Sequence, residues 1–90
     1  NQGRYKEAEE LLKEALDIRI KALGRDNPEV TTTMWVLAIV YIYMGRRAEA
    51  ITLLKEALEI FQKKSKESPV YDNYVKQIKE LIDKIDREID

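Results

Sequence analysis

Two stretches of this 90-residue chain are nearly the same. Residues 3–18 read GRYKEAEELLKEALDI and residues 45–60 read GRRAEAITLLKEALEI, so eleven of sixteen positions are identical at an offset of 42 residues. Self-similarity at a fixed period is typical of repeat arrays, in which each unit buries its apolar face against its neighbours. We therefore expect part of a repeat protein, cut from a longer array.

The chain has only three Gly and two Pro. Most of them lie at predicted helix boundaries and divide the chain into four predicted helices. Gly24 and Gly45 each follow a segment with helical apolar spacing, which predicts left-handed caps at the ends of two helices. Asn27 and Ser68 each precede a proline, which predicts an N-cap with proline at the first helical position. The expected units are the second helix of a truncated repeat at residues 4–23, a full repeat at 28–64 and a C-terminal capping helix at 70–89.

The full repeat resembles the tetratricopeptide repeat family. In that family the first helix carries a Leu-small-x-x-Tyr element, a Gly begins the turn, and the second helix carries spaced small and large apolar residues. The matching residues here are Leu37, Ala38, Tyr41, Gly45, Ala50, Leu54 and Ala57. The resemblance covers about residues 3–68 and implies an all-α fold, a tetratricopeptide-like helical solenoid fragment of four antiparallel helices.

The connection between the first two predicted helices is similar to the kinesin light chain subtype of this family, which also has a 42-residue period. The residues that carry this similarity are Leu23, Gly24, Asp26, Pro28 and Val30. The regular Glu and Lys pattern and the recurring LLKEAL segment resemble a consensus or engineered sequence. One departure is that the chain opens on the second helix of a repeat.

Catalytic chemistry is not expected. The chain has no His and no Cys, which removes the commonest general base, the commonest metal ligand and all thiol chemistry. Carboxylates such as Glu9 are expected on solvated faces, paired with Lys four residues later as in Lys13. Asp83, Asp86 and Asp90 lack the Gly turn of a calcium loop. We expect no enzyme activity, no cofactor and no bound metal.

The charge balance argues against nucleic acid and membrane as partners. Sixteen basic and seventeen acidic residues are interspersed and give a net charge of −1, so there is no basic stripe for nucleic acid or for an anionic membrane surface. The longest apolar run, residues 34–44, is too short to span a bilayer. We expect a cytoplasmic protein, or an engineered chain without a native location, that binds neither nucleic acid nor membrane.

The second predicted helix carries the candidate site, because residues 34–44 are apolar around the whole helix. Such a helix is expected to be buried on every side. The repeat fold covers the side with Leu37 and Tyr41, whereas the opposite side carries apolar residues where the family usually has polar groove residues. These candidate interface residues are Trp35, Val36, Ile39, Ile42 and Tyr43. The matching positions of the fourth helix are polar: Lys76, Gln77, Glu80, Asp83 and Lys84.

Three interpretations of this apolar face stay open. Fully exposed, it would offer on the order of 400–600 Å², more than monomers normally tolerate. The first interpretation is a self-associating module, most simply a homodimer, in which the face meets a second copy. The second is a peptide-binding module that takes an amphipathic helix in its concave groove. The third is that the fourth helix covers the face. Thr31, Thr32 and Thr33, at the start of the same helix, are expected on the surface.

Overall fold

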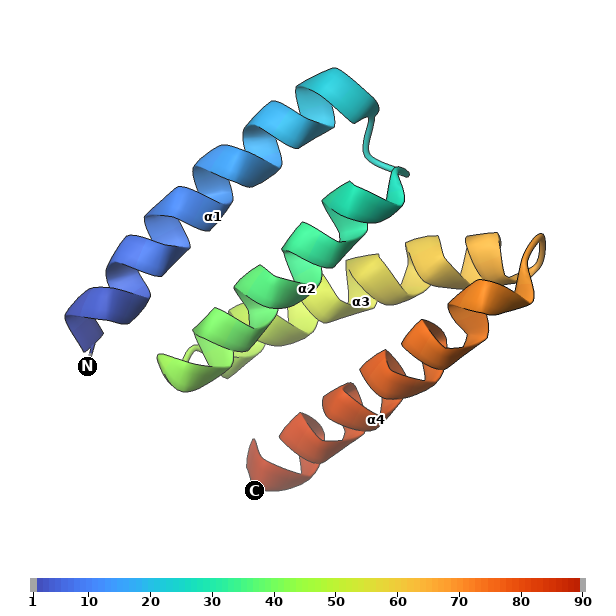
Figure 1. Ribbon diagram of the computed structural model, residues 1–90. Coiled ribbons are helices and arrows are strands. Elements are labelled where there is room, and N and C mark those ends of the chain that lie inside the picture. Colours follow the sequence, from blue (N-terminus) through green and yellow to red (C-terminus); the bar gives the residue numbers. More distant parts are fainter. Residues whose placement is uncertain (1, 90) are drawn as a thin grey trace.

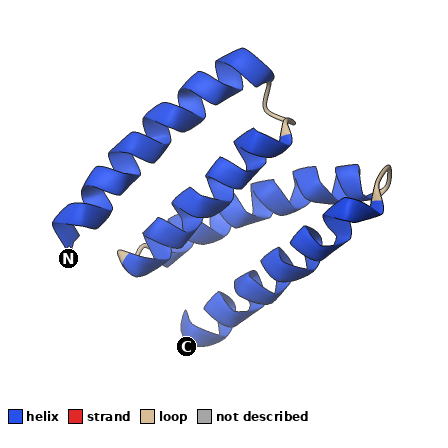
Figure 2. Ribbon diagram, viewed as in Figure 1, coloured by secondary structure: helices blue, strands red, loops and turns tan. Residues whose placement is uncertain are grey.

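The computed structural model describes residues 2–89, and within this range it is built from helices without a strand (Figures 1 and 2). The all-α class predicted from the sequence is confirmed. The elements are α1 (Gln2–Leu23), α2 (Pro28–Tyr43), α3 (Arg47–Ser65), a short 3₁₀ turn η1 (Pro69–Tyr71) and α4 (Asp72–Ile89). Helices that follow one another in the chain pack against one another, and α3 passes behind α2 in the view of Figure 1.

The molecule is thin. Its principal extents are 40 × 35 × 16 Å, and packed helices have axes about 8–10 Å apart. The shortest dimension is therefore that of two helix layers, with α3 behind α2 (Figure 1). As a result, helices keep faces that no other helix covers, which is typical of a solenoid and unlike a closed bundle.

The turns follow the local sequence with one exception. Gly24 and Gly45 have φ values of 85° and 78°, the left-handed conformation expected of them. The Asn27 side chain accepts a hydrogen bond from the backbone N–H of Glu29 at 2.9 Å, so this cap is confirmed. Ser68 occupies the N-cap position with Pro69 after it, as predicted, but its side chain makes no capping hydrogen bond. There the first turn tightens into the 3₁₀ turn η1, so α4 begins at Asp72 rather than at residue 70.

The core lies between α2, α3 and α4, and Phe61 of α3 is at its centre. Phe61 is 1% exposed. Its ring stacks on Tyr74 and Tyr71 of the C-terminal segment, with centroids 5.3 and 5.8 Å away, and Trp35 of α2 lies edge-on at 6.4 Å. The other buried members of this core are Leu37, Ala38, Tyr41, Ala50, Leu54, Ala57, Ile78 and Ile85. One aromatic cluster therefore joins the last three helices.

The threonines at the start of α2 depart from the expectation. Thr32 is exposed as predicted, but Thr31 and Thr33 are buried, so that part of the prediction is wrong. The Thr33 hydroxyl donates to the Glu29 carbonyl at 2.8 Å and accepts a bond from the Arg19 guanidinium of α1 at 2.6 Å. A hydroxyl that finds such partners can be buried at low cost. Thr33 therefore joins α1 to α2.

Candidate protein-interaction surface

Three of the five candidate residues form an exposed strip along α2. Val36 is 42% exposed, Ile39 is 36% exposed and Tyr43 is 65% exposed. They are three and four residues apart, a spacing that places side chains on one face of a helix. We call these three residues the α2 strip. It offers apolar surface on the side of the helix that faces away from the core.

Trp35 and Ile42 lie at the border of this strip and the core. Both are partly buried and pack against the core cluster. The Trp35 ring meets Phe61 edge-on and meets Tyr74 of α4 in the same way, with centroids 5.9 Å apart in the second pair. The expectation that Trp35 lies outside the core of its own repeat is wrong, because Phe61 belongs to that repeat. On this face of α2, Trp35 is in contact with Tyr74 of α4.

Two further aromatic residues border the strip. The Tyr5 ring of α1 stacks on Tyr43, with centroids 5.5 Å apart and planes 5° apart. Tyr74 of α4 is 41% exposed beside Trp35. Neither Tyr5 nor Tyr74 was predicted to belong to the site, although tyrosine often stands where one end of the side chain is packed and its polar end stays in water.

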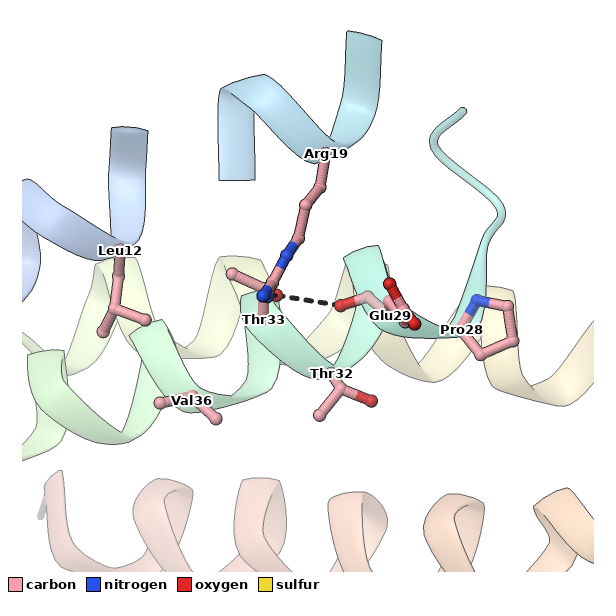
Figure 3. Close-up of a pocket in the computed structure, with 7 residues that line it drawn as sticks. All are labelled: Leu12, Arg19, Pro28, Glu29, Thr32, Thr33 and Val36. Atoms are coloured by element: carbon pink, nitrogen blue, oxygen red, sulfur yellow. Dashed lines mark hydrogen bonds between the residues drawn. The ribbon is translucent and has the colours of Figure 1, made fainter. Parts of the chain in front are cut away.

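An open hollow of about 380 Å³ adjoins Val36 between α1 and α2. Figure 3 shows Arg19 reaching from α1 to Thr33, with the hydrogen bond from Thr33 to Glu29 beside it. Leu12 and Val36 supply its apolar lining. The hollow therefore combines apolar surface with a cation, a carboxylate and hydroxyl groups.

The structure buries Glu9, so the expectation of a solvated face is wrong for this carboxylate. It is 6% exposed on α1. Its carboxylate lies 3.1 Å from Lys13, the predicted partner, and 2.8 Å from Arg46, which follows α2. The Arg46 guanidinium also lies over the Tyr41 ring, 4.5 Å from its centroid. The group is a brace between α1 and the turn that joins α2 to α3.

The charge state of this brace follows from its contacts. Burial raises the pKa of the Glu9 carboxyl, but hydrogen bonds with Lys13, Tyr41 and Arg46 outweigh that effect and leave the pKa below its ordinary value. Glu9 is therefore ionised at neutral pH, with two cations beside it. A carboxylate held in this way stabilises the helix contact and has no proton to donate.

Within residues 2–89, no group of three or more acidic, Cys or His side chains is arranged to hold a metal ion. Asp90, one of the three aspartates considered above, lies outside the described residues. None of the helices in the same range has the length and apolar character needed to cross a membrane.

Successive helices packed into an open array, with one face left uncovered, define a class of protein, the helical repeat proteins or solenoids. A family model for the tetratricopeptide repeat matches residues 1–63, so the chain belongs to the tetratricopeptide repeat family. Proteins of this family are generally scaffolds rather than enzymes. The match ends within α3, so α4 lies outside it.

One curated relative illustrates how the repeat is used in longer chains. The tetratricopeptide repeat protein 19 homolog, mitochondrial, of Drosophila melanogaster is 37% identical over 59 residues. The match covers 66% of this chain but only 16% of that protein. This chain therefore spans a small part of the relative it matches. No solved structure gives a significant match.

Proposed function

We propose that this chain is a protein-interaction module that self-associates through the α2 strip. The observation that carries the proposal is the exposure of Val36, Ile39 and Tyr43 on one helical face. Each of them is apolar or aromatic, and the matching face of α4 carries charged and amide side chains. Protein surfaces of this kind commonly mark contact sites. A second copy offers the same strip, so a twofold pair can bury both at once.

The exposed apolar area of the α2 strip sets the expected affinity of self-association. With about 150–250 Å² for a large side chain, the exposed fractions leave on the order of 300 Å² of apolar surface per chain. Two copies would bury about 600 Å² of it, below the roughly 1,200–2,000 Å² of a standard interface. At about 25 cal/mol/Å² the gross gain is about 15 kcal/mol. Association costs of about 4–15 kcal/mol offset most of this gain. We expect a weak dimer, with a dissociation constant in the micromolar range or above.

Sedimentation velocity over a concentration series tests self-association. The parent chain should shift from monomer to dimer as its concentration rises to about 1 mM, the upper end of the weak affinities expected. Ile39→Lys should keep the chain monomeric, because it places a charge at the centre of the strip. Trp35 is unsuitable for this test because it packs on Phe61.

Val70→Lys is the matched control, since Val70 is an exposed apolar residue of η1, 70% exposed, outside the strip. This variant should dimerise like the parent. Circular dichroism should show the same helix content in all three proteins. A parent chain that stays monomeric throughout, or an Ile39→Lys variant that dimerises normally, would rule the proposal out.

A peptide-binding role is the second candidate, and the hollow beside Val36 favours it. An amphipathic helix could place its apolar side on Val36 and Ile39 and its polar groups near Arg19 and Glu29. Selection from a library of helical peptides with the parent chain, repeated with Ile39→Lys, tests this role. Peptides enriched only by the parent would support it. Equal enrichment with both proteins would contradict it.

The finer assignments stay predictions. The kinesin light chain subtype, an engineered origin and a cytoplasmic location rest on the sequence alone. The fruit-fly relative is mitochondrial by name, which offers a different compartment for comparison. Imaging of a fluorescent fusion of the full-length protein, with cytoplasmic and mitochondrial markers, would distinguish the two locations.

A further inference from the structure

The most exposed residue of the α2 strip, Tyr43, is held by a residue of another helix. Its ring stacks on that of Tyr5 in α1, with centroids 5.5 Å apart and planes 5° apart. Tyr5 is partly buried, whereas Tyr43 stays 65% exposed with its ring on Tyr5. Two nearly parallel rings at this distance attract one another. The stack therefore fixes the orientation of a ring that is otherwise open to solvent.

The internal repeat shows that helix packing does not require this aromatic pair. At the offset of 42 residues Tyr5 corresponds to Arg47 of α3, and Tyr43 matches Lys84 when α2 and α4 are aligned by their prolines. Two cationic side chains cannot stack as two rings do. Helices α3 and α4 nevertheless pack together, and Ile85, next to Lys84, is 2% exposed. The packing of α1 on α2 therefore does not explain why both positions are tyrosine.

The exposure of the α2 strip is a property of its place in the repeat. On α4 the residues that match the strip are Gln77, Glu80 and Lys84, and all three are exposed. They are exposed although α2 precedes α4 and Trp35 contacts Tyr74. A helix at this place in the array thus keeps this face in solvent when its neighbour is present. An aromatic ring there meets water unless a partner molecule covers it.

A fixed aromatic ring suits a contact between molecules. Tyrosine and tryptophan are among the residues that dominate protein interfaces. Each side chain that becomes immobilised on association costs free energy, and a ring already held in the free protein avoids part of that cost. Tyr43 has the largest exposed fraction in the strip, and Tyr5 restricts its ring before any partner arrives. The pair is therefore prepared for binding in the free chain.

We propose that Tyr43 is the anchor of the contact between two copies and that Tyr5 is a positioning residue that holds its ring for that contact. This inference rests on the proposed self-association through the α2 strip. Val36 and Ile39 supply the surrounding apolar surface. The interaction surface then depends on α1 as well as on α2, so two successive repeats contribute to it.

Sedimentation velocity over a concentration series, with variants at the two tyrosines, tests the positioning role. Tyr5→Leu keeps an apolar side chain but has no ring to stack. It should weaken dimerisation about two- to tenfold for each ring that is no longer held, and therefore about four- to hundredfold for a twofold pair. Tyr5→Phe keeps the ring and should dimerise within about twofold of the parent. Tyr43→Ala should weaken dimerisation more than Tyr5→Leu, because it removes the anchor itself.

The second repeat supplies a matched control. Arg47→Ala changes the counterpart position on α3 and should dimerise like the parent. Circular dichroism should show the same helix content in all of these proteins. If Tyr5→Leu lost helix content, Tyr5→Arg would take its place, because α3 carries arginine at this position and still packs on α4. Tyr5→Arg should lower the affinity at least as much as Tyr5→Leu.

The outcomes separate this inference from the proposal on which it rests. A parent chain that stays monomeric would refute the self-association and the positioning role together. If the parent dimerised, Ile39→Lys did not, and Tyr5→Leu dimerised like the parent, only the positioning role would be refuted. A Tyr5→Phe variant as weak as Tyr5→Leu would show that the hydroxyl acts rather than the stacked ring, which also overturns the inference. Equal weakening by Arg47→Ala would overturn it too, since the effect would not be specific to the stack.

Discussion

Replacement of Phe61 by alanine removes the ring that joins three elements of the fold. The side chain is 1% exposed, and three aromatic rings lie within 5.3–6.4 Å of its centroid. Two of these partners, Tyr71 and Tyr74, come from the C-terminal segment, and the third, Trp35, comes from α2. The substitution therefore creates a cavity and weakens the attachment of α4 at the same time.

The expected loss follows from the burial. Phe→Ala substitutions in cores cost about 3–5 kcal/mol, and the cost falls where neighbours can close the cavity. Tyr74 is 41% exposed and can shift inward, so we expect about 3–4 kcal/mol here. A 90-residue domain has a total stability of about 5–13 kcal/mol, at about 0.05–0.15 kcal/mol per residue. The variant should therefore lose from a quarter to most of its free energy of unfolding.

Urea unfolding followed by tryptophan fluorescence measures this loss, because Trp35 is the single tryptophan and lies beside Phe61. With a slope of about 1.5 kcal/mol per molar urea, the midpoint should fall by about 2 M. The midpoint of Phe61→Leu should fall by less. Lys63→Ala, an exposed change on the same helix, should keep its free energy of unfolding within about 0.5 kcal/mol of the parent value. If Phe61→Ala resembled Lys63→Ala, the account of the core would be refuted.

Three smaller predictions address the local contacts. Glu9→Gln should destabilise the fold by about 1.5–3 kcal/mol at neutral pH, since the amide oxygen can still accept a hydrogen bond but no longer carries the charge that strengthens bonds from two cations. Because the pKa of Glu9 is lower in the folded chain than its ordinary 4.5, its contribution is present above that value and is lost as the pH falls through the folded pKa. The urea midpoints of the parent and of Glu9→Gln should therefore converge as the pH is lowered. A difference that stays constant with pH would contradict the stabilising role of the ionised Glu9. Asn27→Ala should cost about 0.5–2 kcal/mol in thermal unfolding and Asn27→Asp much less, since aspartate also caps; equal losses would argue against the cap. Gly24→Ala should cost about 1–2 kcal/mol from its left-handed φ alone, because an added Cβ would meet no neighbour, and a stabilised variant would show that the turn relaxes.

The sequence alone determined where the helices lie and how the turn between α1 and α2 is built. The left-handed glycine at residue 24 and the cap at Asn27 depend on residues within a few positions, so local chemistry was enough to predict them. The repeat predicted the helical fold because eleven identities at one offset indicate that the same helical unit occurs twice. Ser68 takes the predicted N-cap position, but its side chain makes no capping bond, and a 3₁₀ turn follows in which Tyr71 stacks on Phe61. Local chemistry did not predict that tertiary contact.

Only the tertiary structure decided which helical faces are covered. Helical periodicity shows which residues share a face, but not how far a neighbouring helix extends over it. Trp35 and Ile39 share a face by spacing, yet α4 meets Trp35 and leaves Ile39 exposed. Glu9 and Lys13 are visible as a pair in the sequence, whereas Arg46 is 37 residues from Glu9 and reaches it only when the helices cross. Burial depends on such distant neighbours, because a side chain leaves water only when another part of the chain replaces that water.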